Sequence, residues 1–177
     1  MMLGLYNEYV KKLETVLDNF DWEIVHQLTL SLQEAWRAKN TVFICGNGGS
    51  AGNAIHLAND FNYGIDKKKG LGLRVEALPA NASILTCLAN DEGYDSIFSQ
   101  QLKVKANQND VLIALSGSGK SQNVVNALEV SNYIGMSTFA ILGYSGGKCK
   151  ELAKHPIHFE IEDMQIADDL QLIVGHM

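Results

Sequence analysis

The sequence lacks the features of a disulfide-stabilised, membrane-spanning or nucleic-acid-binding protein. Its three cysteines, Cys45, Cys87 and Cys149, form neither a metal-binding spacing nor an even disulfide set, which fits a reducing cytoplasm. No uncharged stretch is long enough to span a bilayer, and charges interrupt the apolar run of residues 1–13, so we expect no signal peptide. The formal net charge of −6 leaves no basic excess to attract nucleic acid. We therefore expect a cytoplasmic protein with no membrane or nucleic-acid partner.

The chain has the composition of an ordinary globular domain. Its 177 residues are enough for one domain with a full core, and hydrophobic residues make up 46% of them and charged residues 19%. Short apolar segments alternate with helical ones, which predicts an α/β domain over residues 1–177 with a mostly parallel sheet. The expected strands are residues 41–45, 73–78, 111–115, 138–142 and 157–161, with helices expected at 81–88 and 95–106 among others.

The two ends of the chain carry helical patterns. Residues 3–19 and 22–38 each have an amphipathic stripe before the first strand, which is more helix than one sheet needs. Packing between subunits and a plain helical cover both remain open for them. Residues 168–177 form a helical pattern that no glycine or proline follows and that has no lysine or arginine in its last turn, so we expect this helix to continue past residue 177.

A glycine-rich turn follows the first expected strand. Residues 41–45 are short, apolar and β-rich, Gly46–Gly49 form the turn, and a helical pattern begins at Ala51. This order directs backbone N–H groups and the positive end of a helix dipole at an anion. The stretch therefore predicts a site for a phosphate or a carboxylate.

A serine-rich loop follows the third expected strand. Ser116, Ser118 and Ser121 offer three hydroxyl donors beside the start of a helix. Alternatively, these serines only cap the helix and form a turn. Three serines within six residues after a buried strand favour phosphate binding.

Both loops resemble nucleotide-binding motifs incompletely. Gly46–Ala51 fits the loose dinucleotide fingerprint, but the acidic residue at the required distance, Asp66, lies in a lysine-rich loop rather than after an apolar strand. Ser118–Ser121 matches the end of a triphosphate-binding loop, but Ala114 stands where that pattern requires glycine. We expect no nucleotide cofactor.

Four spaced motifs resemble those of the SIS (sugar isomerase) family. They are Gly46–Ser50, Asn90–Asp91, Ser116–Ser121 and Asp168–Gln171, and nearly the whole chain is similar to the phosphoheptose isomerases of that family. The resemblance implies a flavodoxin-like three-layer sandwich with five parallel strands, and a homotetramer that uses residues 1–38 in packing. It also implies isomerisation of D-sedoheptulose 7-phosphate to D-glycero-D-manno-heptose 7-phosphate.

The resemblance further implies which residues hold the substrate. The serine loop would bind the phosphate, and the first glycine loop would contact the sugar. Asp91 and Asp168 would meet sugar hydroxyls, although either could instead cap a helix. The substrate-binding set is Asn47, Gly48, Gly49, Ser50, Asn90, Asp91, Ser116, Gly117, Ser118, Ser121 and Asp168.

Many isomerases of this kind bind zinc, and the resemblance carries over part of that ligand set. His56 takes the place of the first ligand, Asp60 replaces the usual glutamate, and Gln171 takes the place of the glutamine. His56 and Asp60 are four residues apart, so they share one helix face, but this pair alone is a weak metal signal. Alternatively, His56 is a hydrogen-bonded helix histidine at a subunit contact. The second histidine is expected eight residues after Gln171, and His176, five after it, lies about 140° away around a helix and is not assigned.

Isomerisation moves a proton between neighbouring carbons, which requires a positioned base and a group that stabilises the enediolate. Asp60 is the candidate base, Gln171 is the second candidate catalytic residue, and zinc would polarise the carbonyl. The alternative is a non-catalytic SIS protein that binds a phosphosugar or, like the DnaA-initiator-associating relatives, serves as an assembly partner.

Overall fold

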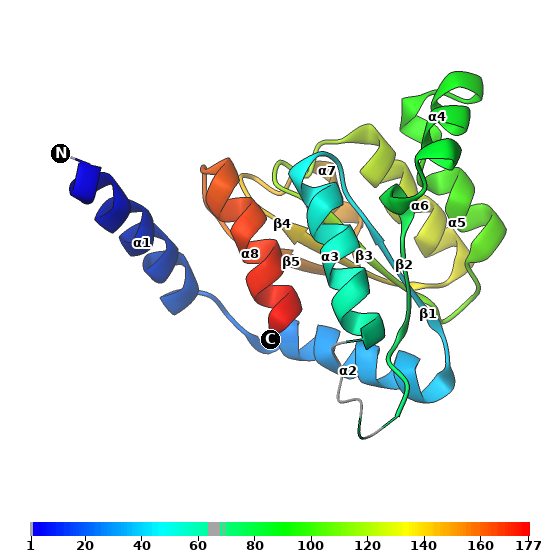
Figure 1. Ribbon diagram of the computed structural model, residues 1–177, viewed down its shortest axis with the longest axis horizontal. Helices are drawn as coiled ribbons and strands as arrows, with labels where there is room; N and C mark the ends of the chain where they lie inside the picture. The colour runs from blue at the N-terminus through cyan, green and yellow to red at the C-terminus, as the bar shows by residue number, and fades with distance from the viewer. Residues whose placement is uncertain (1, 64–67, 69) are drawn as a thin grey trace.

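The computed structural model describes residues 2–63, 68 and 70–177, so Asp66 lies outside the described residues. A five-stranded sheet in the order β2-β1-β3-β4-β5 forms its centre, and every neighbouring pair is parallel (Figure 1). The strands are β1 (Thr41–Cys45), β2 (Arg74–Ala77), β3 (Val111–Ser116), β4 (Ser137–Leu142) and β5 (His155–His158). The expected five-stranded parallel sheet is therefore confirmed.

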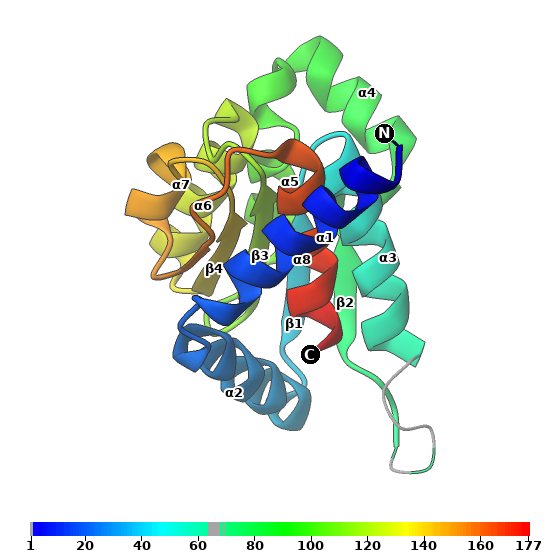
Figure 2. The same cartoon turned by 90° about the vertical axis from the view of Figure 1, so that its left-hand side faces the viewer.

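Helices cover both faces of the sheet, as the alternation of strand and helix predicts. One face carries α2 (Glu23–Ala38), α3 (Gly49–Tyr63) and α8 (Met164–His176). The other carries α5 (Ser99–Lys105), α6 (Gln122–Ile134) and α7 (Gly147–Leu152), with α4 (Ala82–Asp91) at its edge (Figures 1 and 2). Two short 3₁₀ turns, η1 (Leu78–Ala80) and η2 (Tyr94–Ser96), flank α4. The expected three-layer sandwich is confirmed.

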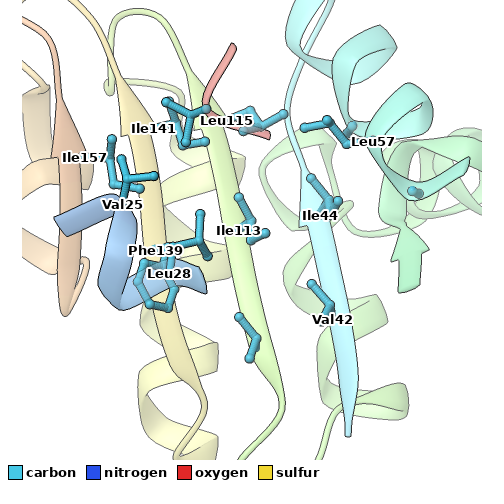
Figure 3. Close-up of a cluster of buried hydrophobic side chains, with 14 of the residues drawn as sticks. Val25, Leu28, Val42, Ile44, Leu57, Ile113, Leu115, Phe139, Ile141 and Ile157 are labelled. Atoms are coloured by element: carbon cyan, nitrogen blue, oxygen red, sulfur yellow. The ribbon is translucent and has the colours of Figure 1, made fainter. Parts of the chain in front are cut away.

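Each face of the sheet has its own hydrophobic core, because successive strand residues point to opposite sides. Val42 and Ile44 of β1 point towards α2, α3 and α8, whereas Phe43 and Cys45 point towards the other helices. Figure 3 shows the first core, in which Leu57 of α3 lies near the strand side chains. The side chains of both cores are almost completely buried. This packing holds the strands, and so the positions at which the loops leave them.

The first helix, α1 (Met2–Asp18), extends away from the sheet (Figures 1 and 2). Its Tyr9 hydroxyl donates a hydrogen bond to the Asp169 carboxylate at α8, and this bond raises the pKa of Tyr9 to about 12. Leu5 and Val10 of α1 are exposed to solvent. No helix among the described residues is long and apolar enough to cross a membrane.

Several expected elements have different bounds, and two differ most. The helix expected over residues 95–106 is split into η2 and α5, because Ile97 and Phe98 between them turn into the core. The strand expected over residues 157–161 is β5, four residues long and ending at His158. It ends there because its partner β4 ends at Leu142, which pairs with His158.

Candidate active site

Both predicted loops lie at the same edge of the sheet. β1 and β3 are neighbours with Cys45 opposite Ala114, so the loops that follow them meet beyond their carboxyl ends. Between the loops and the start of α8 lies a cavity of about 210 Å³. Leu115, Met164 and eight of the predicted substrate-binding residues line it. The eight are Asn47, Gly49, Ser50, Ser116, Gly117, Ser118, Ser121 and Asp168.

The serine hydroxyls remain available as donors. Ser116 Oγ accepts a hydrogen bond from the backbone N–H of Gly119 at 3.1 Å, and Ser118 Oγ accepts one from Lys120 at 3.3 Å. Ser121 begins α6, and within the described residues its side chain makes no capping hydrogen bond. A hydroxyl oxygen that accepts keeps its own hydrogen to donate, so these contacts leave three O–H groups for an anion. These turn contacts therefore leave the hydroxyl hydrogens of the loop unused.

The serine loop is held tightly by the turn that follows β4. Gly119 has a φ of +66°, and a Cβ at this position would lie 1.9 Å from the carbonyl oxygen of Gly146. The Gly119 carbonyl in turn accepts a hydrogen bond from the Cys149 N–H at 3.0 Å. Only glycine fits here, since a side chain would face both a strained backbone and a backbone clash. The loop therefore has a defined shape before any ligand binds.

A buried polar network joins α3 to α8 at the edge of the cavity. Gln171 is 1% exposed, and its Nε2 donates to Ser50 Oγ at 3.0 Å and to Asp168 Oδ1 at 3.3 Å. Its Oε1 accepts from Asn53 Nδ2 at 3.0 Å. Ser50 also donates to Asp168 at 3.1 Å. Asp168 lies inside α8, whose N-cap is Asp163, so the alternative that Asp168 caps this helix is wrong.

Not every predicted residue reaches the cavity. Asn90 and Asp91 end α4 and are exposed, and Asn90 donates to Asp91 at 2.7 Å. Neither they nor Gly48 line the cavity within the described part of the chain. Gly48 instead supplies the carbonyl that accepts the N–H of Ala51 at the first turn of α3, 3.1 Å away.

Farther along the same two helices, three side chains form a compact cluster. His56 Nε2 lies 3.2 Å from His176 Nε2, and Asp60 Oδ2 lies 3.3 Å from the former and 3.5 Å from the latter. All three side chains are between 36% and 51% exposed. Histidine and aspartate are common metal ligands, and the ligand atoms of these three residues lie close enough together to hold one metal ion.

His176 is the residue that the sequence argument left out. It does lie on a different side of α8 from Gln171, as the helix period predicts, but α8 crosses α3 so that this side meets His56. A Cβ at Gly175 would lie 2.3 Å from Leu57 Cδ2, so glycine permits the close approach of the two helices. The pair His56 and Asp60 was visible in the sequence, but the crossing that supplies a third group was not.

The cavity and the cluster lie along one seam, the line along which α3 packs against α8. Ser50 and His56 are six residues apart on α3, which is about 9 Å along a helix axis. The seam therefore has hydroxyl donors for an anion at one end and imidazole and carboxylate groups at the other. That arrangement suits an extended ligand with one phosphate and a polar reacting end.

The chain is similar in sequence to known proteins of one family. The chain matches the SIS domain family over residues 6–143. It is 35% identical over 153 residues to the phosphoheptose isomerase of Akkermansia muciniphila, covering 86% of this chain and 80% of that relative. It is 33% identical over 174 residues to the phosphoheptose isomerase of Helicobacter pylori strain P12, covering 97% of this chain and 87% of the relative.

Solved structures share the fold. The phosphoheptose isomerase from Neisseria gonorrhoeae has a TM-score of 0.88 at 24% identity, covering 99% of this chain and 92% of that chain. The phosphoheptose isomerase from Francisella tularensis has a TM-score of 0.91 at 20% identity, covering 99% and 95%. The three-layer arrangement with helices before the first strand is thus common to all three chains.

Proposed function

The chain belongs to the SIS domain family, and from this premise we propose that it is a sugar-phosphate isomerase acting on a phosphoheptose. The reaction is the aldose–ketose isomerisation of D-sedoheptulose 7-phosphate to D-glycero-D-manno-heptose 7-phosphate. The matches to relatives named phosphoheptose isomerase span most of this chain and most of each relative, which supports the assignment.

The observation that carries the proposal is the cavity at the serine loop. Its volume of about 210 Å³ suits a phosphate group with the adjoining carbon rather than a whole nucleotide. Ser116, Ser118 and Ser121 would donate to the phosphate oxygens, beside the N–H groups at the start of α6. Binding energy at the phosphate, remote from the reacting carbons, would orient the carbonyl end along the seam.

The histidine cluster supports the proposal that the site takes zinc. In a tetrahedral site with ligands about 2.0–2.2 Å from the ion, neighbouring ligand atoms lie about 3.4 Å apart. The three separations within the cluster, 3.2, 3.3 and 3.5 Å, fit that geometry. His56, Asp60 and His176 would hold the ion, which when bound would act as a Lewis acid on the sugar carbonyl.

Gln171 has a different place from the one expected for a metal ligand. Its amide oxygen accepts from Asn53 and its nitrogen donates to Ser50, so its polar atoms are directed at the cavity wall. We therefore propose that Gln171 orients Ser50 and Asp168 towards the sugar instead of completing the metal site.

Asp60 is the proposed base that carries the proton between the two carbons. Both imidazoles approach its Oδ2, so when that oxygen helps to hold the ion, Oδ1 would be left to accept the proton from the substrate. Asp168 would accept hydrogen bonds from sugar hydroxyls, and its own carboxylate is held by Ser50 and Gln171. Asn90 and Asp91 would join the sugar contacts from a neighbouring subunit or after a movement of α4.

A homotetramer in the cytoplasm is part of the proposal. α1 exposes Leu5, Tyr6 and Val10 on one side. An open, mainly apolar groove of about 720 Å³ lies between α2, α3 and α8, with Asp60 and His176 among its lining residues. Exposed apolar side chains and an apolar groove are features of surfaces that make contacts between subunits.

The test is conversion of sedoheptulose 7-phosphate by the purified protein supplied with zinc. Formation of the aldose phosphate, lost in Asp60→Asn, supports the isomerase. Binding of the sugar phosphate by calorimetry without any conversion would instead support a non-catalytic phosphosugar-binding protein, and absence of both binding and conversion would remove the proposed function.

A further inference from the structure

The side-chain amide of Asn47 is held from two sides by residues that the sequence argument did not single out. Asn47 Nδ2 donates to Asn123 Oδ1 at 2.8 Å, and Asn123 Nδ2 donates back to Asn47 Oδ1 at 2.9 Å. The hydroxyl of Tyr94 donates to the same Asn47 Oδ1 at 3.0 Å. The two amides therefore face each other in a reciprocal pair, with the tyrosine as a third member.

The direction of these hydrogen bonds follows from a backbone group. Asn123 Oδ1 also accepts a hydrogen bond from the N–H of Val124 at 3.0 Å. Because a backbone N–H can only donate, the atom of Asn123 that meets it must be the oxygen. The nitrogen of Asn123 then faces Asn47 Oδ1, which sets the orientation of Asn47 as well. Asn123 is only 1% exposed, so water cannot replace these contacts.

We propose that Asn123 and Tyr94 are positioning residues that fix Asn47 as a hydrogen-bond donor to the substrate. Asn47 Oδ1 already accepts two hydrogen bonds, whereas its Nδ2 has a second N–H in addition to the one given to Asn123. Asn47 lines the cavity, so it offers this N–H and not an acceptor. Its partner is an oxygen with a free lone pair, such as a phosphate oxygen or a carbonyl oxygen.

The triad joins three segments of the site. Asn47 lies in the loop after β1, Asn123 in the first turn of α6, and Tyr94 in η2 after the Asn90–Asp91 segment. A separate hydrogen bond, from Asn126 Nδ2 to the carbonyl of Asp95 at 2.9 Å, also ties α6 to η2. Tyr94 is therefore held near Asn47 by backbone as well as by its own hydroxyl. This inference rests on the proposed function, because it takes the cavity as the substrate site.

The experiment is a double-mutant cycle on the affinity for sedoheptulose 7-phosphate, measured by calorimetry, with KM and kcat followed in parallel. Tyr94→Phe is expected to weaken binding and raise KM about threefold to tenfold, the effect of one hydrogen bond, with little change in kcat or in thermal stability. In an Asn47→Ala background the same change is expected to have no further effect, since residues that act through one another are not additive. Tyr133→Phe, on a tyrosine that is 93% exposed, is the control and is expected to change nothing.

Additive losses would overturn the inference, because they would mean that Tyr94 acts on the substrate independently of Asn47. An unchanged affinity in Tyr94→Phe would overturn it as well. A ligand-free measurement separates the inference from the proposed function: the ¹⁵N side-chain amide signals of Asn47 are expected to shift in both Tyr94→Phe and Asn123→Ala. If those signals do not move, the triad is refuted. If they move but the wild-type protein binds no sugar phosphate, the proposed function fails and the role of the triad at a substrate fails with it.

Discussion

The serine-loop cavity and the histidine cluster lie on the same two helices, yet they are built differently. The cavity is formed largely by backbone and by short side chains at the ends of buried strands, and Gly119 is locked against Gly146. The cluster consists of three side chains that are each at least one-third exposed, and it depends on where two helices cross. We expect the cavity to keep its shape without a ligand, and the cluster to gain order only when an ion binds.

The largest expected effect tests the rigidity of the cavity. Gly119→Ala places a Cβ 1.9 Å from a backbone oxygen at a φ of +66°. We expect it to lower the free energy of unfolding by about 3–5 kcal/mol, from left-handed strain and overpacking together. Urea denaturation measures the change.

Gly52→Ala in α3 is the matched control. No atom lies within 4 Å of its added Cβ, so we expect it to stabilise the protein by about 0.5–1 kcal/mol. Equal stability of Gly119→Ala and Gly52→Ala would mean that the serine loop can move to accept a side chain. The cavity would then not be the rigid part of the site.

The next effect tests the ligand set of the cluster. His176→Ala removes one of three proposed zinc ligands, and we expect it to weaken zinc binding by more than about 100-fold, beyond the effect of losing an outer-shell partner. Gln171→Leu should leave zinc affinity nearly unchanged, because Gln171 contacts Ser50 and Asn53. Competition with a chelating dye measures the zinc affinity of both variants. His26→Ala, at an exposed position of α2, is the control. The reverse result would place Gln171 in the metal site.

A smaller effect is expected at the phosphate end. Ser118→Ala removes one hydroxyl donor to a charged group, which is worth about 1.5–3 kcal/mol, or roughly 10- to 150-fold in the affinity for sedoheptulose 7-phosphate. Ser83→Ala, in exposed α4, serves as the control. Zinc affinity should be the same in both, since the cavity and the cluster are separate, and a parallel loss of zinc would contradict that separation.

The smallest effect concerns the attachment of α1 to α8, one residue from Asp168. The Asp169 carboxylate raises the pKa of Tyr9 to about 12, above the value of about 10 expected in the unfolded chain. The hydrogen bond therefore stabilises the fold fully below pH about 10, and this contribution is lost as pH rises towards 12. We expect Tyr9→Phe to cost about 0.5 kcal/mol or less at neutral pH, since the pair is exposed.

Thermal unfolding of wild type and Tyr9→Phe between pH 8 and 12 checks the prediction, with Tyr6→Phe on the exposed side of α1 as the control. The difference between wild type and Tyr9→Phe should shrink over that range. A difference that stays constant would contradict the prediction, because it would mean that ionisation of the Tyr9 hydroxyl does not weaken the contact with Asp169.

The parts of the site that follow from local pattern could be predicted from the sequence. The two loops after buried strands were visible as glycine and serine runs, and parallel strands place such loops at one edge. A helix was expected over residues 81–88, and Asn81 caps the observed helix α4, since its side chain accepts the N–H of Ile84 at 3.2 Å. The residues missed, His176, Asn123 and Tyr94, have no local signal because their importance lies in partners more than 40 residues away.

By itself the sequence determined the class of the fold and the hydroxyl-rich loop that we propose binds phosphate, because strand and helix periods and the hydroxyls of one loop are properties of neighbouring residues. Only the tertiary structure decided which side chains of α3 and α8 meet. The helix period places His176 and Gln171 on different sides of α8, but the angle and depth at which α8 crosses α3 are set by packing around Gly175 and Leu57. That packing brings His176 to His56 and turns Gln171 towards Ser50.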